Sequence, residues 1–196
     1  MKTISRIWLR ARCSLRHLAR DDSGIAATEF AVIVPIMLVL FFGTVEFSSG
    51  IAVDRKVTMM ARTLSDLTSQ STSVGDTDMT NFFAASAGIL TPYPATPTKA
   101  TISELYVDPS TLVARVQWSK AYQGGTVRAQ SSVVAIPTAL KVAGTYLIFS
   151  EVSYQYVPTI GYVMAKTGVN LSDVSYTRPR QSTCVYYSPA TACTTL

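Results

Sequence analysis

The sequence contains little of the residue types on which most enzyme chemistry depends. Among 196 residues it has one histidine, His17, and three cysteines, and it lacks the GxSxG, Walker and SxxK patterns. Because His17 lies close to the N-terminus, the rest of the chain has no Ser-His or Cys-His pair. Two cysteines without a histidine also leave a zinc site short of ligands. We therefore expect no enzymatic activity, no cofactor and no metal.

A pair of carboxylates is the catalytic arrangement that remains open. The acids beyond the apolar N-terminal stretch that would supply it are Asp76, Asp78, Glu104, Asp108 and Glu151. We interpret them as loop and surface acids, since acidic side chains are seldom fully buried. A cell-envelope enzyme stays as the third alternative for function.

Basic charge is scarce outside the first 24 residues. That leader holds six of the 17 basic residues and two of the 12 acidic ones, so it carries +4 of the total net charge of +5. A nucleic-acid-binding domain needs a basic patch on its folded part. The remainder offers only scattered cations, so we expect no nucleic-acid partner.

One long stretch, Gly24 to Phe47, has almost no charge at all. Between Glu29 and Glu46 it contains no ionisable residue, and with its flanks it approaches the roughly 20 apolar residues that span a bilayer. Pro35 removes a backbone hydrogen bond within it, which membrane helices tolerate. A carboxylate just inside such a span costs roughly 3 kcal/mol on insertion scales, so Glu29 is a candidate functional residue.

The front of this stretch is similar to the class III signal of type IV pilin-like proteins. Gly24 directly precedes the apolar run, and Ile25 is the first residue of that run. Glu29 and Phe30 stand where the signal has the fifth and sixth mature residues. The continuation through Ala31, Pro35, Glu46 and Phe47 resembles, more narrowly, the TadE-like minor pilins of tight-adherence (Tad) pili. The later segment 175–180, SYTRPR, is also similar to members of that group.

This resemblance implies a function and a set of partners. A prepilin peptidase would cut between Gly24 and Ile25, and Glu29 and Phe30 would contact neighbouring subunits during assembly. The partners would be major and minor pilins, the Tad platform proteins and an assembly ATPase, all acting at the inner membrane in surface adhesion. The implied fold is α+β and type IV pilin-like, with a long N-terminal helix and an antiparallel β-sheet head.

The leader predicts the orientation of the span. Its six cations precede the apolar run and only Arg55, Lys56 and Arg62 follow shortly after it, which places the N-terminus in the cytoplasm and the head in the periplasm. The apolar residues of the leader recur at helical spacing, so the leader either lies along the membrane surface as an amphipathic stripe or is a solvated basic tail.

No A-x-A site follows the apolar run, so an ordinary secretory signal is disfavoured. The alternative function is an uncleaved, membrane-anchored periplasmic binding domain.

Beyond the span the sequence predicts a helix, a linker and strands. Apolar residues three and four apart continue the helix to about Leu67, giving some 65 Å in all: Val53, Val57, Met60, Leu64 and Leu67. We expect Asp78 or Thr80 to cap a short helix that stops at Gly88.

Apolar and polar residues then alternate with a period of two, which predicts an antiparallel sheet with a meander topology or one close to it. The predicted strands are 101–107, 112–120, 133–136 and 146–157. On the second strand Leu112, Ala114, Val116 and Trp118 would share one face. The predicted divisions are leader 1–24, transmembrane helix 25–47, amphipathic helix 48–68 and head 69–196.

The cysteines divide by compartment. Cys13 lies in the leader, where thiols stay reduced, whereas Cys184 and Cys193 lie on the oxidising side, close together near the C-terminus. We expect these two to form a disulfide that contributes on the order of 3 kcal/mol to the free energy of unfolding.

We interpret four tyrosines on or just after the predicted strands as packing residues, with a recognition surface as the alternative. They are Tyr146, Tyr154, Tyr156 and Tyr162.

Overall fold

The structure is a computed structural model that describes residues 23–158, 167–193 and 195. Most of the predicted leader, including Cys13 and His17, lies outside the described residues, as does Tyr162. The chain divides into two compact units, Met1–Val45 and Glu46–Leu196. From here on we call the second unit the head, which is larger than the head predicted from the sequence, 69–196.

Helix α2 spans Ser23–Ser69 and contains Pro35. It extends the predicted helix by two residues at each end. In its first half the large apolar side chains stay exposed, as in Phe30 at 69% and Leu40 at 65%. In the head the predicted stripe packs inward: Val53, Val57, Met60 and Leu64 are each fully buried.

A short helix follows α2 after the two-residue strand β1 (Ser73–Val74). Helix α3 spans Asp76–Ala87 and is succeeded by the single 3₁₀ turn η1, Gly88–Leu90. The predicted N-cap, Asp78 or Thr80, was three or five residues late, because Gly75 is the N-cap and Asp78 acts from inside the first turn. The Asp78 carboxylate accepts a hydrogen bond from Gly75 N–H at 2.9 Å, which satisfies one of the donors that a helix start leaves open.

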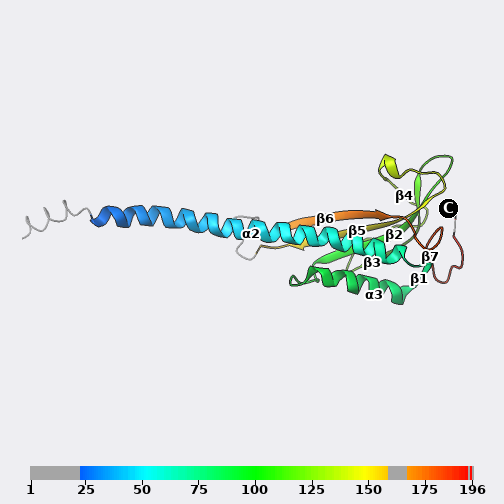
Figure 1. Ribbon diagram of the computed structural model, residues 1–196, viewed down its shortest axis with the longest axis horizontal. Coiled ribbons are helices and arrows are strands. Elements are labelled where there is room, and N and C mark those ends of the chain that lie inside the picture. Colours follow the sequence, from blue (N-terminus) through cyan, green and yellow to red (C-terminus); the bar gives the residue numbers. More distant parts are fainter. Residues whose placement is uncertain (1–22, 159–166, 194, 196) are drawn as a thin grey trace, which may run out of the picture. The chain divides into compact units, whose positions relative to one another are not determined.

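The head is built on a five-stranded antiparallel sheet in the order β4-β3-β2-β5-β6 (Figure 1). The strands are β2 (Thr98–Val107), β3 (Ala114–Tyr122), β4 (Val133–Val134), β5 (Tyr146–Tyr156) and β6 (Val169–Thr177). The predicted meander was wrong in one respect: β5 pairs with β2, not with β4. The 3₁₀ turn η2 (Thr138–Leu140) lies in the connection between β4 and β5, and β7 (Tyr186–Tyr187) pairs in parallel with β1.

A β-bulge divides β3. Glu104 lies opposite Trp118 while Leu105 lies opposite Val116, so Gln117 is the extra residue. A bulge reverses the inward and outward alternation that follows it. Trp118 therefore shares the face of Glu104, and Val116 shares the face of Leu105. The single face predicted for Val116 and Trp118 was wrong for this reason.

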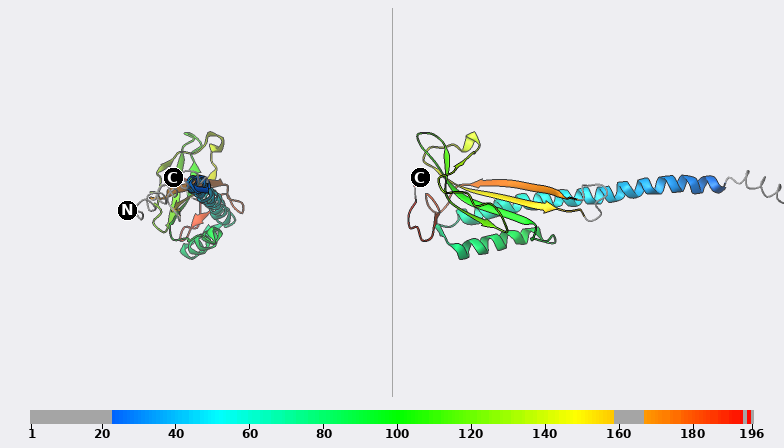
Figure 2. Two further views of the ribbon diagram at one scale, coloured as in Figure 1. Left: turned by 90° about the vertical axis from the view of Figure 1, so that its left-hand side faces the viewer. Right: turned by 180° about the vertical axis from the view of Figure 1, so that it is seen from behind.

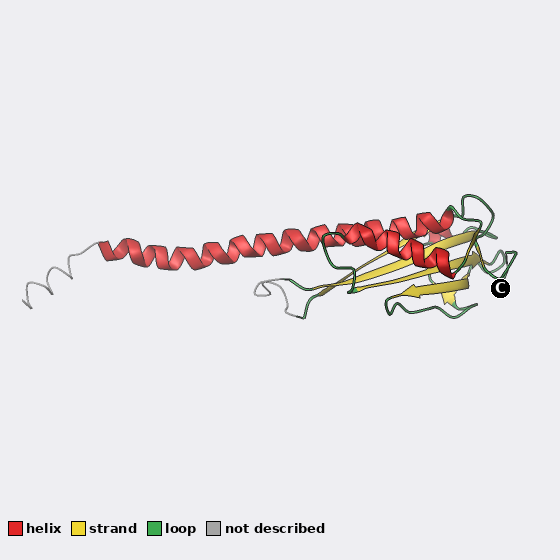
Figure 3. Cartoon of the chain, turned by 90° about the horizontal axis from the view of Figure 1, so that it is seen from below, coloured by secondary structure: helices red, strands yellow, loops and turns green. Residues whose placement is uncertain are grey.

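The two faces of the sheet carry separate cores. The outer half of α2 and α3 cover one face (Figure 3) and enclose a cluster that includes Ile102, Ile148 and Val152. On the other face Leu105, Leu147 and Phe149 pack with residues of β3 and of the following loops. The view from behind shows these loops and the C-terminal segment gathered at one end of the sheet (Figure 2).

Hydrogen bonds fix the register of α2 within the head. Ser150 Oγ, on β5, donates to the backbone oxygen of Ala61 at 2.6 Å in a fully buried position. Lys56 Nζ donates to the backbone oxygens of Ile89 and Thr91 at 2.9 and 2.8 Å. The helix is therefore joined both to the centre of the sheet and to the linker that leads into β2.

Strand β6 forms one edge of the sheet. Within the described part of the chain it pairs along its whole length with β5 and with no other strand. Val174 on this strand is exposed, and its N–H donates to the carboxylate of the preceding Asp173 at 2.8 Å. The sequence patterns did not predict β6, because polar residues occupy most of its positions.

Candidate assembly site

The predicted cleavage bond lies at the beginning of α2. The helix starts at Ser23, so the bond between Gly24 and Ile25 falls in the first turn, where backbone N–H groups have no partner within the helix. A Cβ added to Gly24 would meet no atom within 4 Å. Ile25 is 56% exposed. The bond therefore lies on an exposed part of the described helix.

Glu29 and Phe30 follow on the exposed part of the same helix. Both side chains are exposed, and Glu29 stands four residues after Ile25, which places the two on one side of the helix. Between them Thr28 Oγ1 donates to the backbone oxygen of Ile25 at 2.8 Å. Glu29 is the single ionisable side chain from Gly24 to Val45, so any binding partner of this segment meets one isolated carboxylate in an apolar surface.

The helix that carries these residues is the one candidate membrane span among the described residues. It is long and apolar enough over Gly24–Ser69 to cross a bilayer. Its apolar window is wholly unburied, which distinguishes it from the core helix of a soluble domain. A single-pass membrane anchor fits this helix.

The end of the apolar run contributes to the head, which the sequence patterns did not predict. Glu46 is 3% exposed, and the Tyr156 side chain at the end of β5 lies near it. Burial, Tyr93 and Glu46 raise the pKa of Tyr156, while a hydrogen bond with Ser49 opposes that rise. A Cβ on Gly50 would stand 3.6 Å from the Tyr156 ring. The segment 46–50 thus packs against the side chain of Tyr156. The packing interpretation of Tyr146, Tyr154 and Tyr156 agrees with their burial.

The two C-terminal cysteines are joined in the structure. Cys184 and Cys193 form a disulfide with their Cα atoms 5.8 Å apart. Cys184 is fully buried, and the next residue, Val185, is bound to the sheet through its N–H and its oxygen. The bond closes a loop that lies over the end of β3.

Glu104 holds that loop, and our prediction of a surface acid was wrong for it. It is 2% exposed in the middle of β2. Its carboxylate accepts hydrogen bonds from Val185 N–H at 2.6 Å and from the Trp118 indole N–H at 3.1 Å. The same indole N–H also donates to the Val185 oxygen at 2.6 Å. Burial raises the pKa of Glu104 to about 8, against the lowering effect of the two hydrogen bonds.

Of the other acids, the three aspartates lie on the surface, as predicted, whereas Glu151 is half-buried on β5 in an ion pair. Asp76 is exposed and bound to Lys120 at 3.0 Å, and Glu151 forms a two-pronged ion pair with Arg128 at 2.8 and 2.6 Å. Asp78 and Asp108 are exposed, in α3 and in the turn after β2. In the described residues no group of three or more His, Cys, Asp or Glu side chains is arranged to hold a metal ion.

Comparison with known proteins gives a match to a family of proteins. The profile of the TadE-like protein family matches residues 24–64. No curated protein and no solved structure matches the chain. The matched segment begins at Gly24, includes Glu29 and Phe30, and ends in the part of α2 that packs in the head. From Gly24 to Leu64, the helix that carries the candidate assembly site is therefore similar to the TadE-like protein family.

Proposed function

We propose that this chain is a minor pilin of a Tad pilus. It is made with its leader in the cytoplasm and is held in the inner membrane by the first half of α2, with the head in the periplasm. A prepilin peptidase cuts between Gly24 and Ile25, and the mature chain then joins or primes the pilus together with major and minor pilins. The observation that carries this proposal is the TadE-like match, which begins at the residue before the cut.

The new N-terminus that cleavage creates supplies a charged partner for Glu29. Cleavage creates an α-amino group on Ile25 with an ordinary pKa of about 7.7 to 8.0, so it is largely protonated at neutral pH. A carboxylate and an ammonium are each costly to bury alone and less so as a pair. The exposed apolar surface around Glu29 would be covered in a bundle of such helices. Glu29 then pairs with the amine of a neighbouring subunit and sets the axial register.

The rest of the chain has the properties of a structural subunit. Assembly energy comes from a separate ATPase and from the platform proteins of the membrane, so this chain turns over no substrate of its own. Within the head, the second half of α2 is joined to the sheet by buried contacts and hydrogen bonds such as Ser150 to Ala61.

The decisive experiment is N-terminal sequencing after coexpression with the prepilin peptidase of the same system. We expect Ile25 as the new N-terminus of the wild-type protein. Gly24→Trp should block cleavage, since the peptidase must approach the backbone at this residue. Gly43→Trp, in the same helix but 19 residues on, is the matched control and should be cleaved normally. An intact Met1 in membranes that contain active peptidase contradicts the proposal and favours an uncleaved anchored binding domain.

Orientation is tested separately. A reporter enzyme that is active only in the periplasm, fused after Leu196, should be active, because the cations precede the span. A cytoplasmic reporter at the same place should be inactive. The opposite result would mean that the head faces the cytoplasm and cannot enter a pilus.

A further inference from the structure

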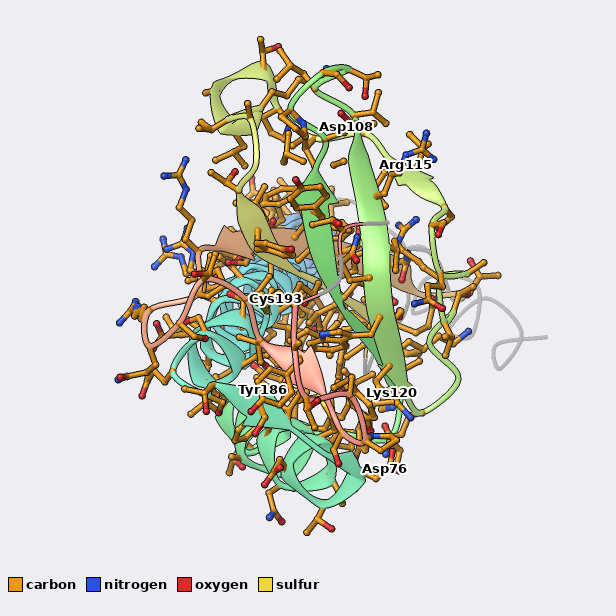
Figure 4. The ribbon with its side chains drawn as sticks, turned by 90° about the vertical axis from the view of Figure 1, so that its right-hand side faces the viewer. Asp76, Asp108, Arg115, Lys120, Tyr186 and Cys193 are labelled. Atoms are coloured by element: carbon orange, nitrogen blue, oxygen red, sulfur yellow. A yellow bond between two sulfur atoms is a disulfide. The ribbon has the colours of Figure 1, made fainter. Side chains whose placement is uncertain are left out.

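A small cavity lies between the C-terminal disulfide loop and the sheet, and none of its lining residues belongs to α2. Its volume is about 130 Å³, which is more than one water molecule needs. Glu104 and Trp118 line it from the sheet, and Tyr186, Tyr187 and Cys193 line it from the C-terminal segment. Figure 4 shows Tyr186 and Cys193 on this segment beside the strand that carries Lys120.

The acid in this cavity has no cationic partner. Among the residues that the structure describes, the ion pairs are those of Asp76, Glu151 and Asp66, and none involves Glu104. The Glu104 carboxylate instead accepts two N–H groups. A buried carboxylate without a cation is costly when ionised, which is the reason for its raised pKa of about 8. A cation that entered the cavity would remove this cost.

Aromatic rings make the walls suitable for an ammonium group. The rings of Trp118 and Tyr187 have their centroids 5.5 Å apart, inclined by 47°. Lys120 Nζ already lies 4.5 Å from the centroid of the Tyr187 ring, so this ring accepts an ammonium on its face. Lys120 is itself held by Asp76 at 3.0 Å, and it does not line the cavity. Its charge is therefore compensated before any ligand arrives.

The remaining walls add neutral polar groups. Gln117 and Gln130 line the cavity, and amide oxygens accept hydrogen bonds from ammonium groups. Gln117 is 4% exposed and Gln130 is exposed, so one amide lies in the interior and the other at the rim. Ala190 and Ala192 complete the rim on the loop. A long unbranched side chain with a terminal cation fits a cavity that is lined by Trp118, Tyr186 and Tyr187.

We propose that this cavity is a binding site for the ammonium group of a lysine side chain presented by a neighbouring protein chain. Glu104 pairs with the ammonium at the floor, and Trp118, Tyr186 and Tyr187 surround the aliphatic stem and the charge. The disulfide between Cys184 and Cys193 holds the loop that forms one wall. The site lies on the head and is independent of the helix contact proposed for Glu29.

The first test measures binding to the full chain in detergent micelles. In a Trp8→Phe background Trp118 is the single tryptophan, so its fluorescence reports directly on the cavity. The probe is Nα-acetyl-lysine methylamide, and the uncharged comparison is the corresponding norleucine compound. We expect a saturable change with the lysine compound only. Glu104→Gln should weaken its binding by about tenfold or more, as expected for the loss of a charged hydrogen-bond partner.

Two further variants separate binding from folding. Glu151→Gln removes another half-buried glutamate, outside this cavity, and should bind the lysine compound as the wild type does. Ala190→Phe fills the cavity from an exposed position of the loop and should block binding while Glu104 stays in place. An equal response to the norleucine compound, unchanged binding in Glu104→Gln, or unchanged binding in Ala190→Phe would overturn the proposal.

The second test identifies the source of the ammonium. A carbodiimide joins a carboxylate to a lysine amine that already touches it, so treating membranes or pili should link Glu104 to a lysine of another protein. Mass spectrometry of the digest should find this peptide in wild type and not in Glu104→Gln. A link to Lys120 of the same chain, or binding of free butylammonium without any link to another protein, contradicts the assignment of a protein partner.

Discussion

The buried carboxyl of Glu104 predicts an unusual dependence of stability on pH. Its pKa is raised from an ordinary 4.5 to about 8 in the folded head. Below pH 4.5 both folded and unfolded chains hold the proton. As the pH rises from 4.5 to 8, the unfolded chain releases it first, so the free energy of unfolding falls. The stabilising contribution is present in acid and is lost by pH 8.

The size of this effect follows from the two pKa values. A difference of one pKa unit corresponds to about 1.4 kcal/mol. The difference between 4.5 and about 8 therefore lowers the free energy of unfolding by about 5 kcal/mol. This is a large fraction of the 5 to 15 kcal/mol that is typical of folded proteins. The effect can be assigned to Glu104, because the one histidine of the chain, His17, lies in the leader and not in the head. Histidine is the other side chain whose ordinary pKa falls in this pH range.

The assay is denaturant unfolding of the full chain in micelles from pH 5 to 9, followed by the fluorescence of Trp118 in the Trp8→Phe background. Wild type should lose stability steadily up to pH 8 and then level off. Glu104→Gln has no proton to release and should show little slope, while Glu151→Gln should keep the wild-type slope. A wild-type free energy of unfolding that stays constant or rises between pH 5 and 8 would refute the reasoning, as would an equal slope in Glu104→Gln.

Three other predictions concern separate contacts. Glu29→Leu should leave insertion and cleavage intact but reduce incorporation into pili, with Glu29→Asp between it and wild type; crosslinking of mature protein to pilin partners measures this, and wild-type incorporation of the leucine variant would exclude the contact. Replacing both Cys184 and Cys193 by serine should lower the free energy of unfolding by about 3 kcal/mol, seen as a lower denaturant midpoint, and an unchanged midpoint would count against it. Ser150→Ala should cost about 1 kcal/mol because it removes the buried hydrogen bond from Ser150 Oγ to the backbone oxygen of Ala61, whereas Ser132→Ala, at an exposed turn, should be close to neutral.

The sequence predicted the elements whose patterns are long and uninterrupted. The apolar run and the stripe from Val53 to Leu64 identified α2 to within two residues at each end. Period-two alternation located β2, β3 and β5 to within three residues. These signals are strong because a single burial requirement repeats over many positions.

The remaining features depend on contacts between distant segments. The bulge at Gln117 is a property of the pairing of β3 with β2, and no residue type marks it. Both faces of β2 are covered, so the alternation that would have distinguished Glu104 from a surface acid is lost. Its burial follows from the C-terminal segment around Val185, which is 81 residues away in sequence. Strands β1 and β7 contain two residues each, too few for any period.

The edge of the sheet at β6 has a consequence for association between copies of this chain. An open strand edge is a template for unwanted sheet extension. Asp173 occupies the backbone donor of Val174 and adds a negative charge that two copies would have to bring together. Under the proposed function, this arrangement would disfavour strand pairing between neighbouring heads in the membrane before any of them enters a pilus.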